Sequence, residues 1–196
     1  MMKLAESFYT RDDVVRIAQE LLGKFLVTNF SGGLTGGMII ETEAYEGVTD
    51  RASHAWNDRR TARTEIMYGR GGLAYVYLCY GIHSLFNIVT NEKDIPHAVL
   101  VRGIMPAEGI EIMKERMGGQ MQKQPGIGPG RVSRLLGIHY SHSGLSLLGD
   151  EIWIEDRGVK IKEDQIISGP RIGVDYAGSD ALMPYRFRIF PGAEKY

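Results

Sequence analysis

Apolar and polar positions alternate most regularly between Met38 and Tyr45. At a spacing of two residues, the side chains divide between two faces of a predicted strand: Met38, Ile40, Thr42 and Ala44 on one, and Ile39, Glu41, Glu43 and Tyr45 on the other. One face can pack on a core, whereas the other carries two carboxylates and ends in an aromatic ring. Two interpretations fit this pattern. The strand either faces a pocket, to which the following polar loop brings His54 and Trp56, or is an edge strand with solvated acids.

Three segments have the features of helices. Residues 10–13 read as an N-cap with acids in the first turn, and the apolar residues that follow recur at helical spacing up to a stop at Gly23. Pro106 is expected to begin a second helix, which ends at the glycine pair 118–119. Pro129 is expected to begin a short third helix.

The other apolar segments alternate or are too short for helices, and they predict a strand-rich fold. Glycine is frequent, with 25 of 196 residues, and its scatter without a period favours many tight turns. Residues 46–72 form a polar loop of a length that is usually functional or disordered. Residues 118–130 form a second loop rich in Gly, Gln and Pro, and we find no repeat or linker, so we expect one domain across residues 1–196. The expected strands cover residues 24–30, 38–45, 73–80, 84–90, 97–102, 152–154, 159–161, 171–174 and 185–189.

The composition excludes several classes of protein. Apolar residues make up 43% of the chain and charged residues 24%, which is ordinary for a globular protein and argues against disorder. The lone Cys79 excludes an internal disulfide, and the five histidines have no metal-ligand spacing, so we expect no metal and no cofactor. Glu6 and Arg11 lie where a signal peptide needs an apolar run, and no segment has the length of a membrane span. We therefore expect a soluble, intracellular protein.

The net charge of −1 does not favour a nucleic-acid partner, because phosphate contacts usually require a basic surface. The arginines are clustered, however, with five in residues 51–70, then Arg131 and Arg134 after a Gly/Pro segment, and Arg186 and Arg188 near the end. These clusters could form a local basic face on a neutral protein. An ordinary solvated surface explains each cluster equally well.

Polar residues within or at the ends of apolar strands are candidates for chemistry. Tyr80 lies at a strand end before a glycine, where a side chain can project from a turn, although the tyrosines of this segment could equally be core edges. Asn87 lies in an apolar run, and its side-chain amide either forms hydrogen bonds with the backbone or binds a ligand. Arg102 ends a buried strand and needs an anionic partner, for which Glu41 or Glu43 is the obvious candidate.

Together these residues favour one kind of reaction. The sequence has no glycine-rich phosphate loop of a standard type and no assignable Ser-His-Asp order. A carboxylate beside several flat rings, an arginine and a basic loop suit hydrolysis of a nucleoside bond. The rings can stack a base, the acid can activate water and the cations can hold phosphates.

Several short motifs follow one another along most of the chain. They are Glu41-Thr-Glu-Ala-Tyr45, His54, Leu73-Ala-Tyr-Val-Tyr77, Tyr80-Gly81, Asn87, Val101-Arg102 and Arg171-Ile-Gly-Val174. In content and order they resemble the alkyladenine (methylpurine, 3-methyladenine) DNA glycosylases, and the Glu-Thr-Glu-Ala-Tyr and Tyr-Val-Tyr-x-x-Tyr-Gly pair is highly specific. The resemblance implies a single α+β domain built on a curved antiparallel β-sheet surrounded by α-helices, which agrees with the strand-rich pattern.

The resemblance also implies an activity. The chain would be a base-excision-repair DNA glycosylase that flips an alkylated or deaminated purine out of duplex DNA and hydrolyses its N-glycosidic bond. Glu43 would be the general base that activates the attacking water, and Arg102 and the backbone of Val174 would hold that water. Periodicity alone cannot choose between Glu41 and Glu43, which share a face of the strand, and the resemblance selects Glu43.

For substrate binding, the resemblance implies that the extruded base stacks between the rings of Tyr45, His54 and Tyr77. The amide of Asn87 would lie at the pocket floor and screen against the amino group of a normal guanine. Tyr80 would be the wedge that enters the minor groove and fills the gap left by the extruded base.

The expected partner is double-stranded DNA that contains damaged purines, with no membrane involved, and the expected form is a monomer that acts where the DNA is, in the cytoplasm and nucleoid or in the nucleus. Arg59, Arg63 and Arg131 are the predicted DNA contacts. No lysine lies between Lys24 and Lys93, so the pocket segments offer no amine for a Schiff base. We therefore expect hydrolysis without strand cleavage.

Two other classes of protein agree with parts of the pattern. A non-catalytic nucleic-acid-binding domain on the same fold would need the basic face and the rings, but not Glu43 and Arg102 together. A small-molecule nucleosidase would need neither Tyr80 nor the arginine loop. Release of free base from alkylated duplex DNA separates the three classes.

Overall fold

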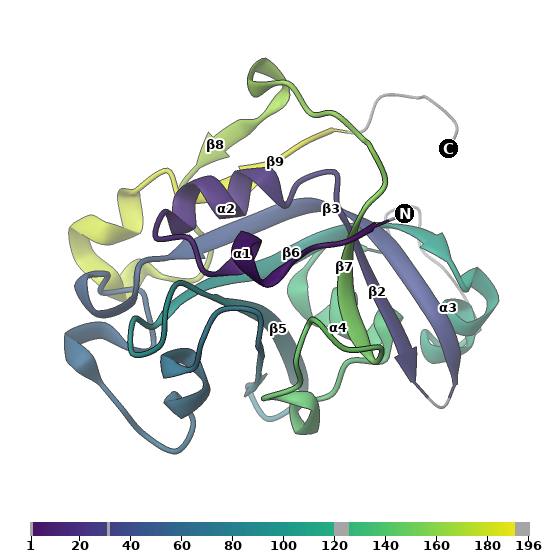
Figure 1. Cartoon of the computed structure of the whole chain (residues 1–196), viewed down its shortest axis with the longest axis horizontal. Coiled ribbons are helices and arrows are strands. Elements are labelled where there is room, and N and C mark those ends of the chain that lie inside the picture. Colours follow the sequence, from purple (N-terminus) through teal and green to yellow (C-terminus); the bar gives the residue numbers. More distant parts are fainter. Residues whose placement is uncertain (1, 31, 120–125, 191–196) are drawn as a thin grey trace.

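The computed structural model describes residues 2–30, 32–119 and 126–190, and its main element is one curved antiparallel sheet (Figure 1). The strand order is β1-β7-β2-β3-β6-β5-β4, and β9 pairs with both β3 and β8. The predicted α+β class with an antiparallel sheet is therefore confirmed. The strands are β1 (Met2–Lys3), β2 (Phe25–Phe30), β3 (Gly33–Tyr45), β4 (Ala74–Cys79), β5 (His83–Thr90), β6 (His97–Glu108), β7 (Ile152–Asp156), β8 (Ile167–Gly169) and β9 (Arg186–Arg188).

Short helices cover one face of this sheet. They are α1 (Glu6–Tyr9), α2 (Val14–Glu20), α3 (Ile110–Arg116) and α4 (Pro129–Leu136). The predicted helix is confirmed, but its cap is Asp13 and not a residue at the start of the segment 10–13, so no acid lies in its first turn: the Asp13 carboxylate accepts the N–H of Arg16 at 2.8 Å. After α2, Gly23 has a φ of +81°, a conformation that glycine adopts without strain, and the chain turns there into β2. The predicted start of α4 at Pro129 is also confirmed.

Alternation along the central strands gives the sheet two different faces. One face packs with the apolar sides of α2 and α4 into the main core, and from β4, β5 and β6 it contributes Ala74, Val76, Phe86, Ile88, Val99 and Val101. The other face is covered by residues 46–72, which form three 3-10 turns and pack through Ala55, Met67 and Tyr68. In Figure 1 this blue segment meets the yellow residues 171–182 at the left end of the sheet.

The strand that carries the two carboxylates lies in the middle of the sheet. β3 pairs with β2 along residues 33–38, with β6 from residue 36 onward and with β9 at residues 41–43. Glu43 has an exposed fraction of 0% and Glu41 of 8%, so the alternative of an edge strand with solvated acids is wrong. The register between β3 and β6 shifts on both sides of Glu41, which interrupts the simple two-residue alternation there.

The prediction that Pro106 begins a helix is wrong. Pro106 lies within β6 and pairs with Gly37, next to a register shift where a missing N–H is tolerated. The helix begins only at Ile110, after Gly109, whose φ is +68°. A Cβ on Gly109 would lie 2.3 Å from the carbonyl oxygen of Leu34, so only glycine allows this close approach.

Two predicted strands are also absent from the described part of the chain. Residues 159–161 are irregular, and their apolar pattern reflects Val159 and Ile161 packing against the main core. Residues 171–174 form no strand either, because Gly173 has a φ of +77° and the Ile172 N–H donates to the side chain of Glu43 and not to the backbone of a neighbouring strand. The predicted loop at 118–130 lies partly outside the described residues, which leave out 120–125.

The remaining predicted strands are confirmed, although β3 begins earlier and β6 ends later than expected, and β1 and β8 are additions. Across residues 2–30, 32–119 and 126–190, the helices are too short and too polar to span a lipid bilayer.

Candidate active site

The register of the central strands aligns the candidate residues on one face of the sheet. Tyr75 of β4 pairs with Asn87 of β5, Asn87 pairs with Leu100 of β6, and Leu100 pairs with Glu43 of β3. Paired residues in an antiparallel sheet point to the same side. Residues from four strands therefore form one row on the face away from the main core.

A cavity of about 310 Å³ lies on this row. Its lining includes seven residues predicted from the sequence: Tyr45, His54, Tyr77, Tyr80, Asn87, Arg102 and Val174. Glu43 lies beneath this lining, fully buried, and touches it through Tyr45, Arg102 and the backbone of Ile172. The structure therefore brings these predicted residues together around one space, across more than half the length of the chain.

Three groups contact the Glu43 carboxylate. The Ile172 N–H donates to Oε1 at 2.9 Å, the Tyr45 hydroxyl donates to Oε2 at 2.8 Å, and Nη1 of Arg102 lies 3.5 Å from Oε1. Burial raises the pKa of Glu43 above its usual value, although Arg102, the amide and the hydroxyl all oppose this shift. When ionised, this carboxylate is therefore a stronger base than a solvated glutamate.

Arg102 lies between the two carboxylates of β3. Its Nε is 3.5 Å from Glu41 and its Nη1 is 3.5 Å from Glu43, so the predicted partnership is confirmed for both acids. Glu41 also lies 3.7 Å from Nε of Arg186. None of these contacts has the geometry of a hydrogen bond, and Nε of Arg102 is buried without a hydrogen-bond partner in the described residues.

Aromatic rings form the wall of the cavity. The ring centroids of His54 and Tyr77 are 4.6 Å apart, at an interplanar angle of 73°. Nδ1 of His54 is hydrogen-bonded to the hydroxyl of Tyr75 at 2.8 Å, and burial, with Arg63 and Arg59 nearby, lowers the pKa of His54 to about 4. The histidine is therefore neutral at pH 7.

Tyr75 lines the cavity but was not among the predicted site residues. The signal that could have found it is the two-residue period, because Tyr75 and Tyr77 share a face of one strand. Tyr176 and Ile172 also line the cavity. Ile172 lies in an irregular segment and Tyr176 in a short 3-10 helix (Asp175–Leu182), so no two-residue period points to either.

The side chain of Asn87 both forms hydrogen bonds with the backbone and lies at the cavity, so the two interpretations of its position both hold. Its Nδ2 donates to the backbone carbonyls of Tyr75 and Leu85, each at 3.2 Å, so the backbone uses both amide hydrogens. Its side chain also lines the cavity. The carbonyl oxygen is the polar atom that remains for a ligand, and Asn87 can therefore act there as an acceptor.

Tyr80 is a surface residue at the turn between β4 and β5. Its exposed fraction is 92%, and its φ of +51° is uncommon for a residue with a side chain. The neighbouring Ile82 is 72% exposed. The interpretation of Tyr80 as a core edge is therefore wrong, and the hairpin projects two large apolar side chains into solvent.

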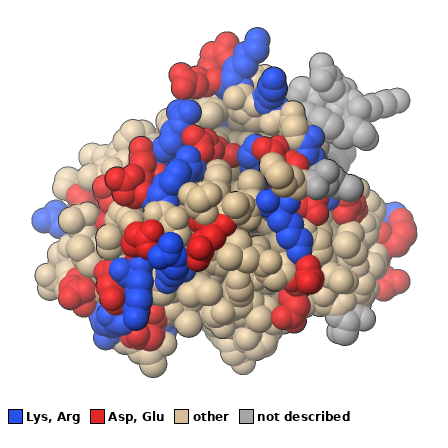
Figure 2. All heavy atoms as spheres, viewed as in Figure 1, with Lys and Arg blue, Asp and Glu red and all other residues tan. Residues whose placement is uncertain are grey.

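The arginines of residues 51–70 fall into two groups. Two of them form ion pairs with two carboxylates each. Arg60 pairs with Glu65 and Asp94, and Arg70 pairs with Glu6 and Glu92. Arg51, Arg59 and Arg63 are exposed and form no ion pair with the described residues, and the same is true of Arg131 on α4. On the face seen in Figure 2, basic and acidic side chains are interleaved, which matches the net charge near zero.

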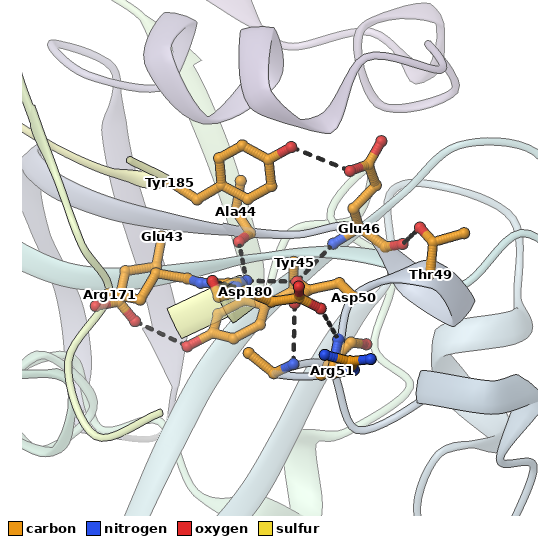
Figure 3. A network of polar contacts seen from close by, with 12 residues as sticks. Glu43, Ala44, Tyr45, Glu46, Thr49, Asp50, Arg51, Arg171, Asp180 and Tyr185 are labelled. Carbon is orange, nitrogen blue, oxygen red and sulfur yellow. Dashed lines mark hydrogen bonds and ion pairs between the residues drawn. The ribbon is translucent and has the colours of Figure 1, made fainter. Parts of the chain in front are cut away.

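A second buried ion pair lies next to the cavity (Figure 3). The guanidinium of Arg171 binds both oxygens of Asp50 and also donates to the backbone carbonyls of Ala44 and Asp180, at 2.9 and 3.1 Å. The partners Asp50 and Arg171 are 121 residues apart, and no sequence pattern links them. As for metals, the described residues contain no cluster of three His, Cys, Asp or Glu side chains that could hold an ion.

Comparison with known proteins gives a consistent result. The family described as methylpurine-DNA glycosylase (MPG) matches residues 7–191. A protein of Chlamydia felis is 46% identical over 190 residues, which cover 95% of both chains, and one of Bacillus cytotoxicus is 42% identical over 195 residues, again 95% of both. A protein of Clostridium perfringens strain 13 is 41% identical over 197 residues, 96% of each chain. All three carry the name "Putative 3-methyladenine DNA glycosylase".

Proposed function

Because the chain belongs to the methylpurine-DNA glycosylase family, we propose that it excises alkylated or deaminated purines from duplex DNA by hydrolysing the N-glycosidic bond. The observation that carries this proposal is the fully buried carboxylate of Glu43, held beneath a cavity with aromatic walls. The volume of about 310 Å³ is at the lower end of the range for small-ligand pockets, as expected for a site that accepts a single base.

In the proposed reaction, Glu43 accepts a proton from a water molecule as its oxygen attacks C1′ of the nucleotide. The bond between C1′ and the purine nitrogen breaks, its electron pair stays with the base, and an abasic sugar remains. Arg102 and the backbone of Val174 hold the water. The unsatisfied Nε of Arg102 and the raised pKa of Glu43 support these roles.

The rings suit a base that carries positive charge, as a purine alkylated on a ring nitrogen does. Tyr45, His54 and Tyr77 would stack on the extruded base, and the faces of tyrosine rings attract cations. His54 is neutral at pH 7 and adds no charge to repel such a base. A charged purine is already a good leaving group, so one base and a stacking cage suffice.

Asn87 would select among bases at the cavity floor. Because its amide hydrogens are used by the backbone, its carbonyl oxygen faces the substrate as an acceptor. An acceptor can bind the N–H groups of adenine-like and hypoxanthine-like bases. The proposed screening against the amino group of guanine would then depend on the fixed position of this side chain.

Duplex DNA would be bound on the side of the exposed hairpin. Tyr80 would fill the gap left by the extruded base, and its exposure supports this role. Arg59, Arg63 and Arg131 would contact phosphates, because all three are exposed and form no ion pair with the described residues. His83 and Arg131 line one groove beside the hairpin, where the backbone of a bound strand could lie.

The proposed enzyme is a monofunctional hydrolase that acts as a monomer on cellular DNA. In the described part of the chain, no lysine lines the cavity, so no amine is placed to form a Schiff base with C1′. Borohydride should therefore trap no covalent adduct with DNA during turnover.

The deciding experiment incubates the protein with duplex DNA treated with a methylating agent and measures free methylpurine by chromatography. Release of base, and its loss in Glu43→Gln, is the expected result. Binding of the DNA without release would favour a non-catalytic domain. Release from free nucleosides but not from duplex would favour a nucleosidase.

A further inference from the structure

The most completely satisfied charged pair in this region, Asp50 with Arg171, does not line the cavity. Both side chains are buried, with exposed fractions of 1% and 0%. The Asp50 carboxylate also accepts the backbone N–H groups of Glu46 and Ala52, at 3.1 and 2.9 Å. This pair therefore ties residues 44–52 to residues 171–180.

Arg171 contacts both parts of the proposed active site. Its guanidinium carbon lies 4.8 Å from the centre of the Tyr45 ring, and its Nη1 donates to the carbonyl of Ala44, which separates Glu43 from Tyr45 in the sequence. The next residue, Ile172, donates its N–H to Glu43 at 2.9 Å. Figure 3 shows this arrangement, with Arg171 between the Glu43–Tyr45 strand and Asp50.

Stability alone does not explain such a pair. Removing two charges from water is costly, and replacing a buried ion pair with apolar residues of similar size is often neutral or stabilising. A guanidinium does, however, provide several donors in a fixed plane, which apolar side chains cannot imitate. The pair is therefore better explained by the groups that it orients.

We propose that Asp50 and Arg171 are positioning residues that hold the Glu43 carboxylate and the Tyr45 ring in one fixed arrangement. Base and stacking surface are then aligned before the substrate arrives. The inference rests on the proposed function only in that Glu43 acts as the base and Tyr45 stacks on the substrate. Neither Asp50 nor Arg171 touches the reacting atoms.

The same arrangement controls the proton affinity of Glu43. The groups that face this carboxylate are Arg102 from β6, Glu41 and Tyr45 from β3, Arg186 from β9, and Arg171 with the Ile172 amide from the irregular segment. The Tyr45 hydroxyl and the Ile172 amide stabilise the ionised carboxylate by hydrogen bonds. Losing their alignment should move the titration of Glu43 to higher pH.

The test uses the double variant Asp50→Asn/Arg171→Met, which removes both charges together and leaves none uncompensated. Its excision of methylated base in single turnover should fall by about 10²-fold, the loss expected from a displacement of about 1 Å at the reacting groups. The titration of Glu43, followed by NMR of protein with 13C-labelled glutamate carboxyls and assigned by Glu43→Gln, should move to higher pH.

The matched control is Arg157→Met. Arg157 is also largely buried, lies 4.3 Å from the ring centre of Phe25 and pairs with Glu108 and Glu155, but it does not line the cavity. The Arg157→Met variant should have a lower free energy of unfolding than the wild type, and Glu43 should titrate at the same pH in both. If the double variant does not fold, Arg171→Lys keeps the charge but loses the planar set of donors, and it should shift the titration in the same direction.

A folded double variant with wild-type excision and an unchanged Glu43 titration would overturn the proposal, because the pair would then be purely structural. If the wild-type protein releases no base, the proposed function fails. The NMR titration needs no DNA, so it still decides whether the pair positions Glu43.

Discussion

Two buried arginine–carboxylate clusters lie close to each other in this protein, and they differ in how fully their hydrogen bonds are satisfied. Arg171 donates to both oxygens of Asp50 and to two backbone carbonyls, and only its Nε lacks a partner in the described residues. Arg102 lies 3.5 Å from each of two carboxylates and hydrogen-bonds to neither.

The difference follows from where the two clusters lie. The Asp50–Arg171 pair is enclosed by chain segments on all sides, so its donors are used to hold backbone in place. Arg102 lies in the wall of the cavity, with a side chain that is 13% exposed. Donors that the protein does not use remain available to a ligand. In this protein, the arginine that makes no hydrogen bond to its carboxylates is the one that lines the cavity.

The largest expected effect tests the cluster of Arg102 with Glu41 and Glu43. Glu43→Gln keeps the shape of the side chain but removes the proton acceptor, so excision in single turnover should fall by ~10²–10⁴-fold while binding to abasic DNA persists. Glu41→Gln is the matched control, because it removes the other carboxylate near Arg102. It should reduce the rate much less. The reverse order of effects would show that the wrong carboxylate has been assigned.

The next largest effect tests the Asp50–Arg171 pair. Arg171→Met alone leaves Asp50 buried and unpaired, and the free energy of unfolding, measured by urea denaturation, should fall by ~3–5 kcal/mol. Arg102→Met should lower it less, because Glu43 has a raised pKa and can take up a proton when its partner is removed. An equal or larger loss in Arg102→Met would contradict the distinction between the two clusters.

A third prediction extends the comparison to tyrosines. Tyr80 is 92% exposed, whereas Tyr75 is 2% exposed and hydrogen-bonded to His54. Tyr80→Ser should change the free energy of unfolding by no more than ~0.5 kcal/mol. It should weaken excision from duplex by ~1–3 kcal/mol, the range for stacking on bases, and affect single strands less. A large loss of stability would instead indicate a structural role.

The surface arginines allow a similar comparison. Arg59 and Arg63 have no ion pair with described residues, whereas Arg60 and Arg70 each bind two carboxylates. In Arg59→Ala/Arg63→Ala, the slope of log affinity against log salt should decrease by ~0.9 for each phosphate that the protein no longer neutralises. Arg60→Ala/Arg70→Ala is the control and should change the slope less. Equal slopes in the first variant and the wild type would place the DNA-binding face elsewhere.

The smallest effect concerns pH. Because burial raises the pKa of Glu43, the folded protein binds this proton more tightly than the unfolded chain does. Its contribution to the free energy of unfolding therefore falls as pH rises from the usual glutamate pKa to the raised one, and Glu43→Gln lacks this fall. Urea denaturation at a series of acidic pH values measures the free energy of unfolding of the wild type and of Glu43→Gln, and only the wild type should show this fall.

The rate of excision should show the same group. The rate should fall on the acid side of its pH profile at a pH above the usual range of carboxyl pKa values, because the Glu43 carboxylate must be ionised to act as the base. No further limb from His54 is expected near pH 6.5, since its pKa is lowered to about 4. A rate that stays constant through the acidic range would contradict a buried carboxylate as the base.

Much of this protein follows from the sequence by itself. The two-residue period of β3, β4 and β5 places Glu43 beside Tyr45, and Tyr75 beside Tyr77, because alternation is a property of each strand's own backbone. The helix start at Pro129 is a local signal in the same sense and is confirmed, and the cap signal of residues 10–13 marks the right helix although the cap itself is Asp13.

Other features depended on contacts between distant segments. Pro106 is a helix-start signal in isolation, but it extends β6 because β3 offers a pairing edge as far as Gly36. Whether β3 is an edge or a central strand depends on its neighbours, which the alternation within β3 cannot specify. The Asp50–Arg171 pair joins residues 121 positions apart, and the position of Arg102 between the two carboxylates depends on the pairing of β3 with β6. Local backbone geometry determines which side chains share a face, but only long-range packing decides what that face meets and which of its charges stay unsatisfied.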